Sequence, residues 1–203
     1  ADIAPVLTQL NAYKRDNTLT AEDLYINSKT PYGYNYVDGD LDVTHDNDSE
    51  GEHGSHVAGI ATANRYIDTG ASYENARDVV RMSGMAPDAQ LITLKVFGYN
   101  PGPYDSDYFA AIEDAIWLGC DSVNLSLGSG SPGYSYNSQF AELLEFMATT
   151  DTVVVMSAGN SGNWADHVLA YNMMYADEGG TYTTSEPATY ANSFSVASAD
   201  SVG

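Results

Sequence analysis

The segment Val153-Val154-Val155-Met156-Ser157-Ala158-Gly159-Asn160 is the most informative about the fold class of this 203-residue chain. It begins as a short, β-branched apolar run, typical of a strand buried on both faces of a parallel sheet, and ends in small and polar residues. Further strands are predicted at residues 32–37, 90–97, 122–127 and 193–198. Helical periodicity occurs between them. This alternation predicts an α/β fold with a mostly parallel sheet between layers of helices.

Three helices are predicted from spacing and end signals. Residues 106–118 repeat apolar side chains at helical intervals, with Ser106 as the expected N-cap and Gly119 just past the end. Residues 138–149 place Phe140, Leu143, Leu144 and Met147 on one face. Another helix, small and apolar, is expected to start at His53. Short helical patterns also occur within residues 5–13.

A parallel sheet indicates where function should lie. Ligands bind beyond the carboxyl ends of such strands. Two of these ends are the glycine-containing segments 126–129 and 157–160. Glycine there would let the backbone approach a substrate closely.

Charge and composition exclude several classes of function. The 28 acidic and 7 basic residues give a formal charge of −21, which disfavours nucleic acid and anionic membranes as partners. The sequence contains no apolar run of 18 residues, so no membrane span is expected. The single cysteine, Cys120, has no partner for an internal disulfide and is expected to pack in the interior.

An acidic segment, residues 38–52, raises the question of calcium. Two stretches begin like EF-hand loops, but the first has Val43 where glycine is needed and the second has Val57 where glutamate is needed. An EF-hand is therefore excluded, and no metal ligand is assigned. A looser calcium site and a solvated acidic loop both stay open.

Three motifs in order resemble the subtilase family of serine proteases: residues 52–59 (Glu-His-Gly-Ser-His-Val-Ala-Gly), 122–128 (Ser-Val-Asn-Leu-Ser-Leu-Gly) and 153–162. The resemblance implies that His53 is the general base and Asn160 the oxyanion-hole donor. It implies that Ser126, Leu127 and Gly128 pair with an extended peptide substrate, and that Ser157, Ala158 and Gly159 line the first specificity pocket. Residues 98–104 fall near the segment that pairs with the other side of the substrate.

Other segments resemble one group within this family. Residues 31–36, the acidic segment and residues 86–91 look like the cell-envelope proteinases of Gram-positive bacteria, the lactocepin and C5a-peptidase group. This implies a secreted or cell-envelope protein that acts on proteins or peptides. It also implies that residues 1–203 are a partial catalytic domain with an incomplete three-layer subtilisin-like fold. The chain would end near the insertion point of a protease-associated domain.

Two parts of the family's catalytic triad have no match. No aspartate upstream of His53 ends an apolar strand in an Asp-Thr-Gly or Asp-Ser-Gly motif, and the nucleophile motif Gly-Thr-Ser-Met-Ala is absent. We therefore expect the isolated chain to be inactive, and exposed sheet edges could drive dimerisation. The alternatives are a degenerate peptide-binding or partner-binding module and an acidic cation-binding surface domain.

Overall fold

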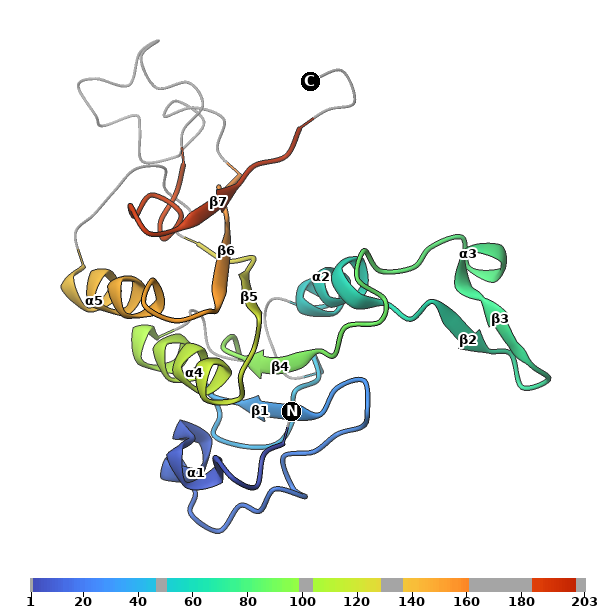
Figure 1. The fold of residues 1–203 in the computed structure, drawn as a ribbon, viewed down its shortest axis with the longest axis horizontal. Coiled ribbons are helices and arrows are strands. Elements are labelled where there is room, and N and C mark those ends of the chain that lie inside the picture. Colours follow the sequence, from blue (N-terminus) through green and yellow to red (C-terminus); the bar gives the residue numbers. More distant parts are fainter. Residues whose placement is uncertain (1, 47–50, 99–103, 129–136, 161–183, 200–203) are drawn as a thin grey trace. The chain divides into compact units, whose positions relative to one another are not determined.

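The structure is a computed structural model that describes residues 2–46, 51–98, 104–128, 137–160 and 184–199. It divides into two compact units, Ala1–Gly119 and Cys120–Gly203. Figure 1 shows the elements of both units, and each unit is described by itself.

The N-terminal unit contains a parallel strand pair among short helices. Strand β1 pairs with β4 in parallel, with Tyr32 opposite Ile92 and Asn35 opposite Lys95 (Figure 1). All four residues of β1 are buried, as expected for a parallel strand covered on both faces. The elements of this unit are η1 (Leu7–Gln9), α1 (Asn11–Arg15), β1 (Tyr32–Asn35), α2 (His53–Thr62), β2 (Tyr66–Asp68), β3 (Tyr73–Asn75), α3 (Ala76–Val79), β4 (Ile92–Lys95) and α4 (Asp105–Trp117).

Helix α4 follows the predicted periodicity. Its buried residues include Tyr108, Ala111, Ile112 and Ala115, which share one face, and Gly119 follows the helix with φ +71°. The predicted N-cap was wrong, because Tyr104 occupies that position and Ser106 lies inside the first turn. The Tyr104 side chain makes no capping hydrogen bond, and Asp105 and Asp107 supply negative charge at this helix start.

A buried carboxylate on α4 fastens α1. The Asp114 side chain accepts hydrogen bonds from the backbone N–H of Asn11 (2.6 Å) and of Ala12 (3.0 Å), and from the Tyr36 hydroxyl (2.7 Å). The Tyr36 hydroxyl also lies 3.1 Å from that of Tyr32. Amides that begin α1 are thereby satisfied by a residue 102 or 103 positions away in sequence.

Burial dominates the ionisation of this network. Desolvation raises the pKa of Asp114 above its ordinary value, although the amides of Asn11 and Ala12 and the Tyr36 hydroxyl oppose that shift. Burial likewise raises the pKa of Tyr32 and Tyr36 far above the usual tyrosine range. Arg15 adds a second attachment, with a 2.9 Å ion pair to Asp107 and a hydrogen bond to the Tyr36 carbonyl.

The C-terminal unit contains a three-stranded, fully parallel sheet. Its order is β5 (Ser122–Leu125), β6 (Val153–Ser157) and β7 (Phe194–Val196), and the helix among the described residues of this unit is α5 (Ser138–Met147). Ser122 lies opposite Val153 in the first pair, and Val155 lies opposite Phe194 in the second. These pairings confirm the parallel arrangement expected from the apolar runs.

Helix α5 buries its predicted face, Phe140, Leu143, Leu144 and Met147. Asn137 is its N-cap and accepts hydrogen bonds from two first-turn amides, at 3.0 and 3.2 Å. The Phe140 ring packs on Tyr190 with centroids 5.0 Å apart. Within the described part of the chain, no helix has the length and apolar character needed to cross a membrane.

Candidate active site

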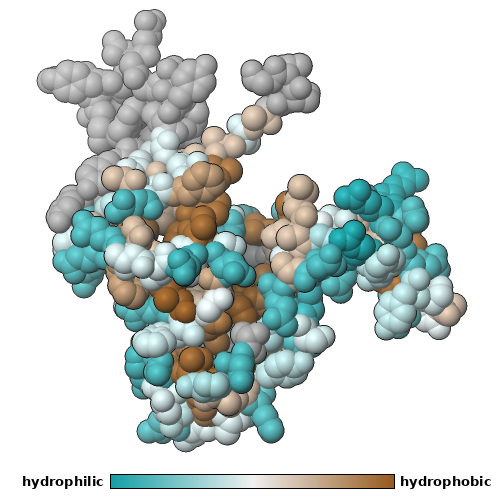
Figure 2. Space-filling view, in the orientation of Figure 1, coloured by the Kyte–Doolittle hydropathy of each residue, from teal (hydrophilic) through white to brown (hydrophobic). Residues whose placement is uncertain are grey.

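His53 is the first residue of α2, as the sequence predicts. The N–H of His56 donates to the Glu52 carbonyl at 2.9 Å and closes the first helical turn. His53 itself is exposed, and none of the residues of α2 is buried. Figure 2 shows the apolar character of this exposed helix, whose Ile60 is 49% exposed.

The far end of α2 is held by the segment that follows α3. Amides of Gly84, Met85 and Ala86 donate to carbonyls in the last turn of the helix and just beyond, at 2.8–2.9 Å. A Cβ at Gly84 would lie 2.3 Å from the Ala63 nitrogen, so only glycine permits this approach. The helix that presents His53 is thus fixed at its C-terminal end by backbone hydrogen bonds.

The other candidates come together in the C-terminal unit. Because β5 and β6 are parallel and in register, their carboxyl ends lie at the same edge of the sheet. Residues 126–128 therefore lie beside residues 157–160. The Ser157 hydroxyl donates to the Leu127 carbonyl at 3.3 Å and joins the two ends.

A further segment, residues 184–187, lies against both strand ends, which the sequence did not indicate. The Ser185 N–H donates to the Ala158 carbonyl at 2.9 Å. A Cβ on Gly128 would lie 2.6 Å from the Glu186 carbonyl oxygen, and one on Gly159 would lie 2.6 Å from the Ser185 Oγ. Gly159 also has φ +99°, a conformation that favours glycine. Asn160 follows directly and is exposed.

The candidate residues fall in two groups. His53 belongs to the N-terminal unit, whereas residues 126–128 and 157–160 belong to the C-terminal unit. The structure brings the second group together within one unit. Residues 99–103, which belong to the segment expected to pair with the other side of a substrate, lie outside the described residues.

Asp38, which follows β1, is already engaged locally. The side-chain amide of Asn35 donates to the Asp38 carboxylate at 2.9 Å. The side-chain oxygen of Asn35 accepts from the backbone amides of Val37 and Asp38. A Cβ on Gly98 would lie 2.9 Å from the Asp38 carboxylate. Asp38 therefore closes the turn after β1.

The acidic segment forms local turns where it is described. The Asp42 carboxylate accepts from the amide and the hydroxyl of Thr44, at 2.9 and 2.6 Å. Among the described residues, no group of three or more His, Cys, Asp or Glu side chains could hold a metal ion. Residues 47–50 of this segment lie outside the described part.

Comparison with known proteins identifies the relatives of this chain. The sequence profile of the subtilase family matches residues 12–202. The PI-type proteinase of Lactococcus lactis subsp. cremoris is 36% identical over 179 residues, which are 87% of this chain and 9% of that protein. A C5a peptidase of Streptococcus pyogenes is 29% identical over 158 residues, which are 76% of this chain and 12% of that protein. A solved structure of the S41 psychrophilic protease has a TM-score of 0.45 at 24% identity, covering 71% of this chain and 38% of that one.

The chain thus spans about a tenth of the length of these curated relatives. The relatives belong to the group that the motifs resemble, and the parallel strands with their helices agree with a subtilisin-like α/β fold. Since the family profile covers nearly every residue of the chain, this protein is a member of the subtilase family.

Proposed function

We propose that this chain supplies the general base and the oxyanion donor of a subtilisin-like serine endopeptidase. His53 is the base, and the Asn160 side-chain amide is the donor. The observation that carries the proposal is the position of Asn160, three residues beyond the end of β6 and at the sheet edge that β6 shares with β5. Family membership supports the same assignment.

The chemistry explains why these residue types suit these positions. A serine hydroxyl is a weak nucleophile at neutral pH and needs a base that titrates near the working pH, which histidine provides. The attacked carbonyl develops negative charge on its oxygen, and a fixed amide donor stabilises that charge in the transition state. In subtilisin, loss of the corresponding asparagine lowers kcat by about 10²–10³-fold.

Substrate binding would use the neighbouring backbone. Residues Ser126, Leu127 and Gly128 offer main-chain groups to an extended peptide, while Ser157, Ala158 and Gly159 form one wall of the first specificity pocket. Main-chain pairing gives affinity without selecting side chains. The hydrogen bond between the Ser157 hydroxyl and the Leu127 carbonyl supports this picture, because it fixes the two segments to one another.

The isolated 203-residue chain should lack peptidase activity. No aspartate upstream of His53 lies in the motif that orients the histidine, and the serine motif that supplies the nucleophile is absent from its sequence. We propose that a longer polypeptide provides both. The expected inactivity of the isolated chain is tested by measuring its turnover of a casein-type substrate. Robust activity that a serine-reactive inhibitor abolishes would contradict the prediction.

The residue assignments require an active, longer polypeptide. There, Asn160→Ala should lower kcat by about 10²–10³-fold with little change in KM, because the donor acts on charge that develops only in the transition state. His53→Ala should abolish the acyl-enzyme burst. Asn192→Ala is the matched control, since Asn192 is exposed and lies before β7. Equal losses for Asn160→Ala and Asn192→Ala would reject the assignment of Asn160.

We also propose a cellular location and an oligomeric state. A secreted or cell-envelope location follows from resemblance alone. Dimerisation of the isolated chain is supported by β7, the edge strand of the sheet among the described residues of the C-terminal unit, with Phe194 62% and Val196 46% exposed. A single monomeric species in sedimentation at tens of micromolar would exclude that dimer.

A further inference from the structure

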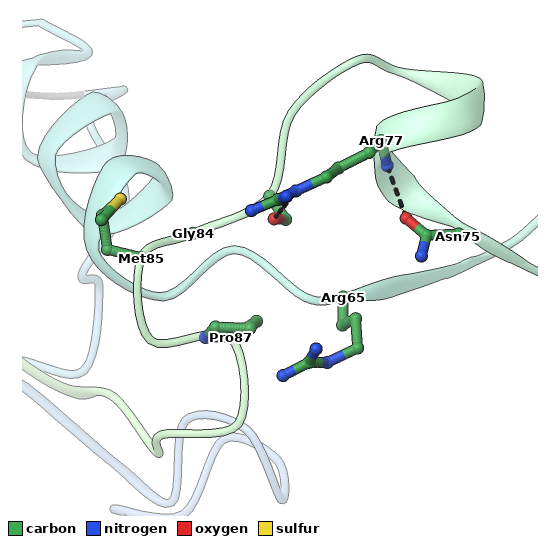
Figure 3. A pocket seen from close by; sticks show the side chains of 7 residues that line it. Arg65, Asn75, Arg77, Gly84, Met85 and Pro87 are labelled. Atoms are coloured by element: carbon green, nitrogen blue, oxygen red, sulfur yellow. Dashed lines mark hydrogen bonds between the residues drawn. The ribbon is translucent and has the colours of Figure 1, made fainter.

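A cluster of arginines stands apart from the proposed active site. The chain has only 7 basic residues against 28 acidic ones, yet three of the seven, Arg65, Arg77 and Arg81, fall within 17 positions of each other. Two of them, Arg65 and Arg77, line a cavity of about 240 Å³ between the β2–β3 hairpin with α3 and the segment 83–87. Figure 3 shows both side chains extending from the hairpin side toward that segment.

The cavity offers hydrogen-bond donors in excess of acceptors. The Arg77 Nε donates to the Ser83 hydroxyl at 3.2 Å, and no acceptor of its two terminal nitrogens occurs among the described residues. The Asn75 side-chain oxygen is used by the Arg77 backbone N–H, which leaves the Asn75 amide nitrogen to face the cavity (Figure 3). The Ser83 hydroxyl accepts from Arg77 and can therefore donate to a third group.

The charge inside the cavity is close to one positive unit. Arg65 forms a 2.7 Å ion pair with Asp88, so its charge is compensated. Arg77 forms no ion pair with any described residue. One uncompensated guanidinium matches a monoanion better than a dianion, and the planar fork of arginine pairs with a carboxylate through two parallel hydrogen bonds.

The rim of the cavity favours a peptide as the carrier of that carboxylate. Met85 lines the cavity and is 85% exposed, the highest exposure among the large apolar residues that the structure describes, and Pro87 also lines it. These side chains can cover the methylene groups of a glutamate. The geometry points to a carboxylate-binding site on the β2–β3 hairpin, in which Arg77, Asn75 and Ser83 hold an acidic side chain of a peptide. The site does not depend on the proposed peptidase function.

A titration of the 203-residue chain with acetyl-Gly-Glu-Gly-amide tests the site. Binding is followed by the ¹⁵N–¹H signals of the arginine Nε–H groups at low ionic strength, with acetyl-Gly-Gln-Gly-amide and inorganic phosphate as comparison probes. We expect saturable, salt-sensitive shifts of the Arg77 signal with the glutamate peptide and none with the glutamine peptide. Equal shifts with both peptides, or tighter binding of phosphate than of the glutamate peptide, would overturn the assignment.

Two charge-matched variants separate a built site from general attraction. Arg77→Gln should weaken binding roughly fivefold or more, the size expected for one exposed bidentate pair. Arg81→Gln removes the same charge from the same segment outside the cavity and should leave binding unchanged. Arg77→Lys keeps the charge but lacks the planar guanidinium, so it should weaken binding as Arg77→Gln does. Unchanged backbone spectra of each variant confirm that it is folded. Equal weakening by Arg77→Gln and Arg81→Gln, or full affinity in Arg77→Lys, would refute the site.

Discussion

Replacement of Asp114 by alanine tests how the N-terminal segment is held. Asp114 is fully buried on α4 and accepts hydrogen bonds from the amides of Asn11 and Ala12 and from the Tyr36 hydroxyl. Alanine removes the carboxylate that accepts all three hydrogen bonds. The Tyr36 hydroxyl keeps the Tyr32 hydroxyl as a partner, so the two amides carry most of the loss.

The expected magnitude follows from the burial of those amides. A buried donor left without a partner costs about 1–3 kcal/mol. The contact at Ala12 is buried and counts in full, whereas that at Asn11 is partly exposed, so its amide can bind water. Alanine also removes the free-energy cost of burying the carboxylate, which offsets part of this loss. We therefore expect Asp114→Ala to lower the free energy of unfolding by about 2–4 kcal/mol.

Two measurements check this estimate. Urea unfolding gives the loss of free energy, and amide hydrogen exchange of a peptide spanning residues 8–16 reports release of α1. Asn11→Ala is a useful comparison, because it removes side-chain bonds to Ala110 and Glu113 but keeps the backbone amide on Asp114. Unchanged exchange of residues 8–16 in Asp114→Ala would refute the anchoring argument, even if overall stability fell.

The same network has a defined pH dependence. Burial raises the pKa of Asp114, so the folded protein holds this proton more tightly than the unfolded chain. The resulting stability is fully present below the ordinary aspartate pKa of about 3.9 and is lost as pH rises through the folded pKa. Asp114→Asn, which cannot titrate, should lack this component. The stability of the unaltered chain relative to Asp114→Asn should thus fall across that window; a rise would show that the fold favours the carboxylate.

Three further outcomes follow from named contacts. Since burial raises the pKa of Tyr32 and Tyr36, both should stay protonated above pH 10 until the chain unfolds. The stability that they contribute below pH 10 should be lost as pH rises. Completion of tyrosine ionisation, followed at 295 nm, before unfolding would contradict this prediction. Asn137→Ala should lower urea stability by about 1 kcal/mol through loss of the α5 N-cap, whereas Asn137→Asp should largely preserve it. Burial also raises the pKa of the Cys120 thiol, so iodoacetamide at pH 8 should react several times more slowly with the folded chain than with the urea-unfolded chain; equal rates would count against burial.

The elements that the sequence predicts are those with long, regular patterns. Helix α4 repeats buried residues over 13 positions, and β6 begins with three consecutive valines, so the local pattern suffices. The β2–β3 hairpin was missed because each strand has only three residues, too few to show alternation. Gly70, with φ +80° at its turn, was the available signal.

The contacts of Asp114 could not be predicted in the same way. They join residues about a hundred positions apart, and nothing local distinguishes Asp114 from the exposed acids of an acidic chain. For the candidate site, the motifs pointed to the ends of β5 and β6, and the parallel register explains why these two ends lie at the same edge of the sheet. The segment 184–187 was not predicted to join them, because its position depends on tertiary packing.

That segment changes how two glycines at the candidate site are understood. The sequence suggests that Gly128 and Gly159 are small so that a substrate can approach the backbone. In the structure, the positions that their Cβ atoms would fill lie 2.6 Å from the Glu186 carbonyl and from the Ser185 Oγ, so the chain itself occupies this space. A side chain at either position would displace the segment before it met any peptide. Loss of function in such a variant would therefore report the packing of residues 184–187, and substrate contact has to be tested at neighbouring residues such as Ser126.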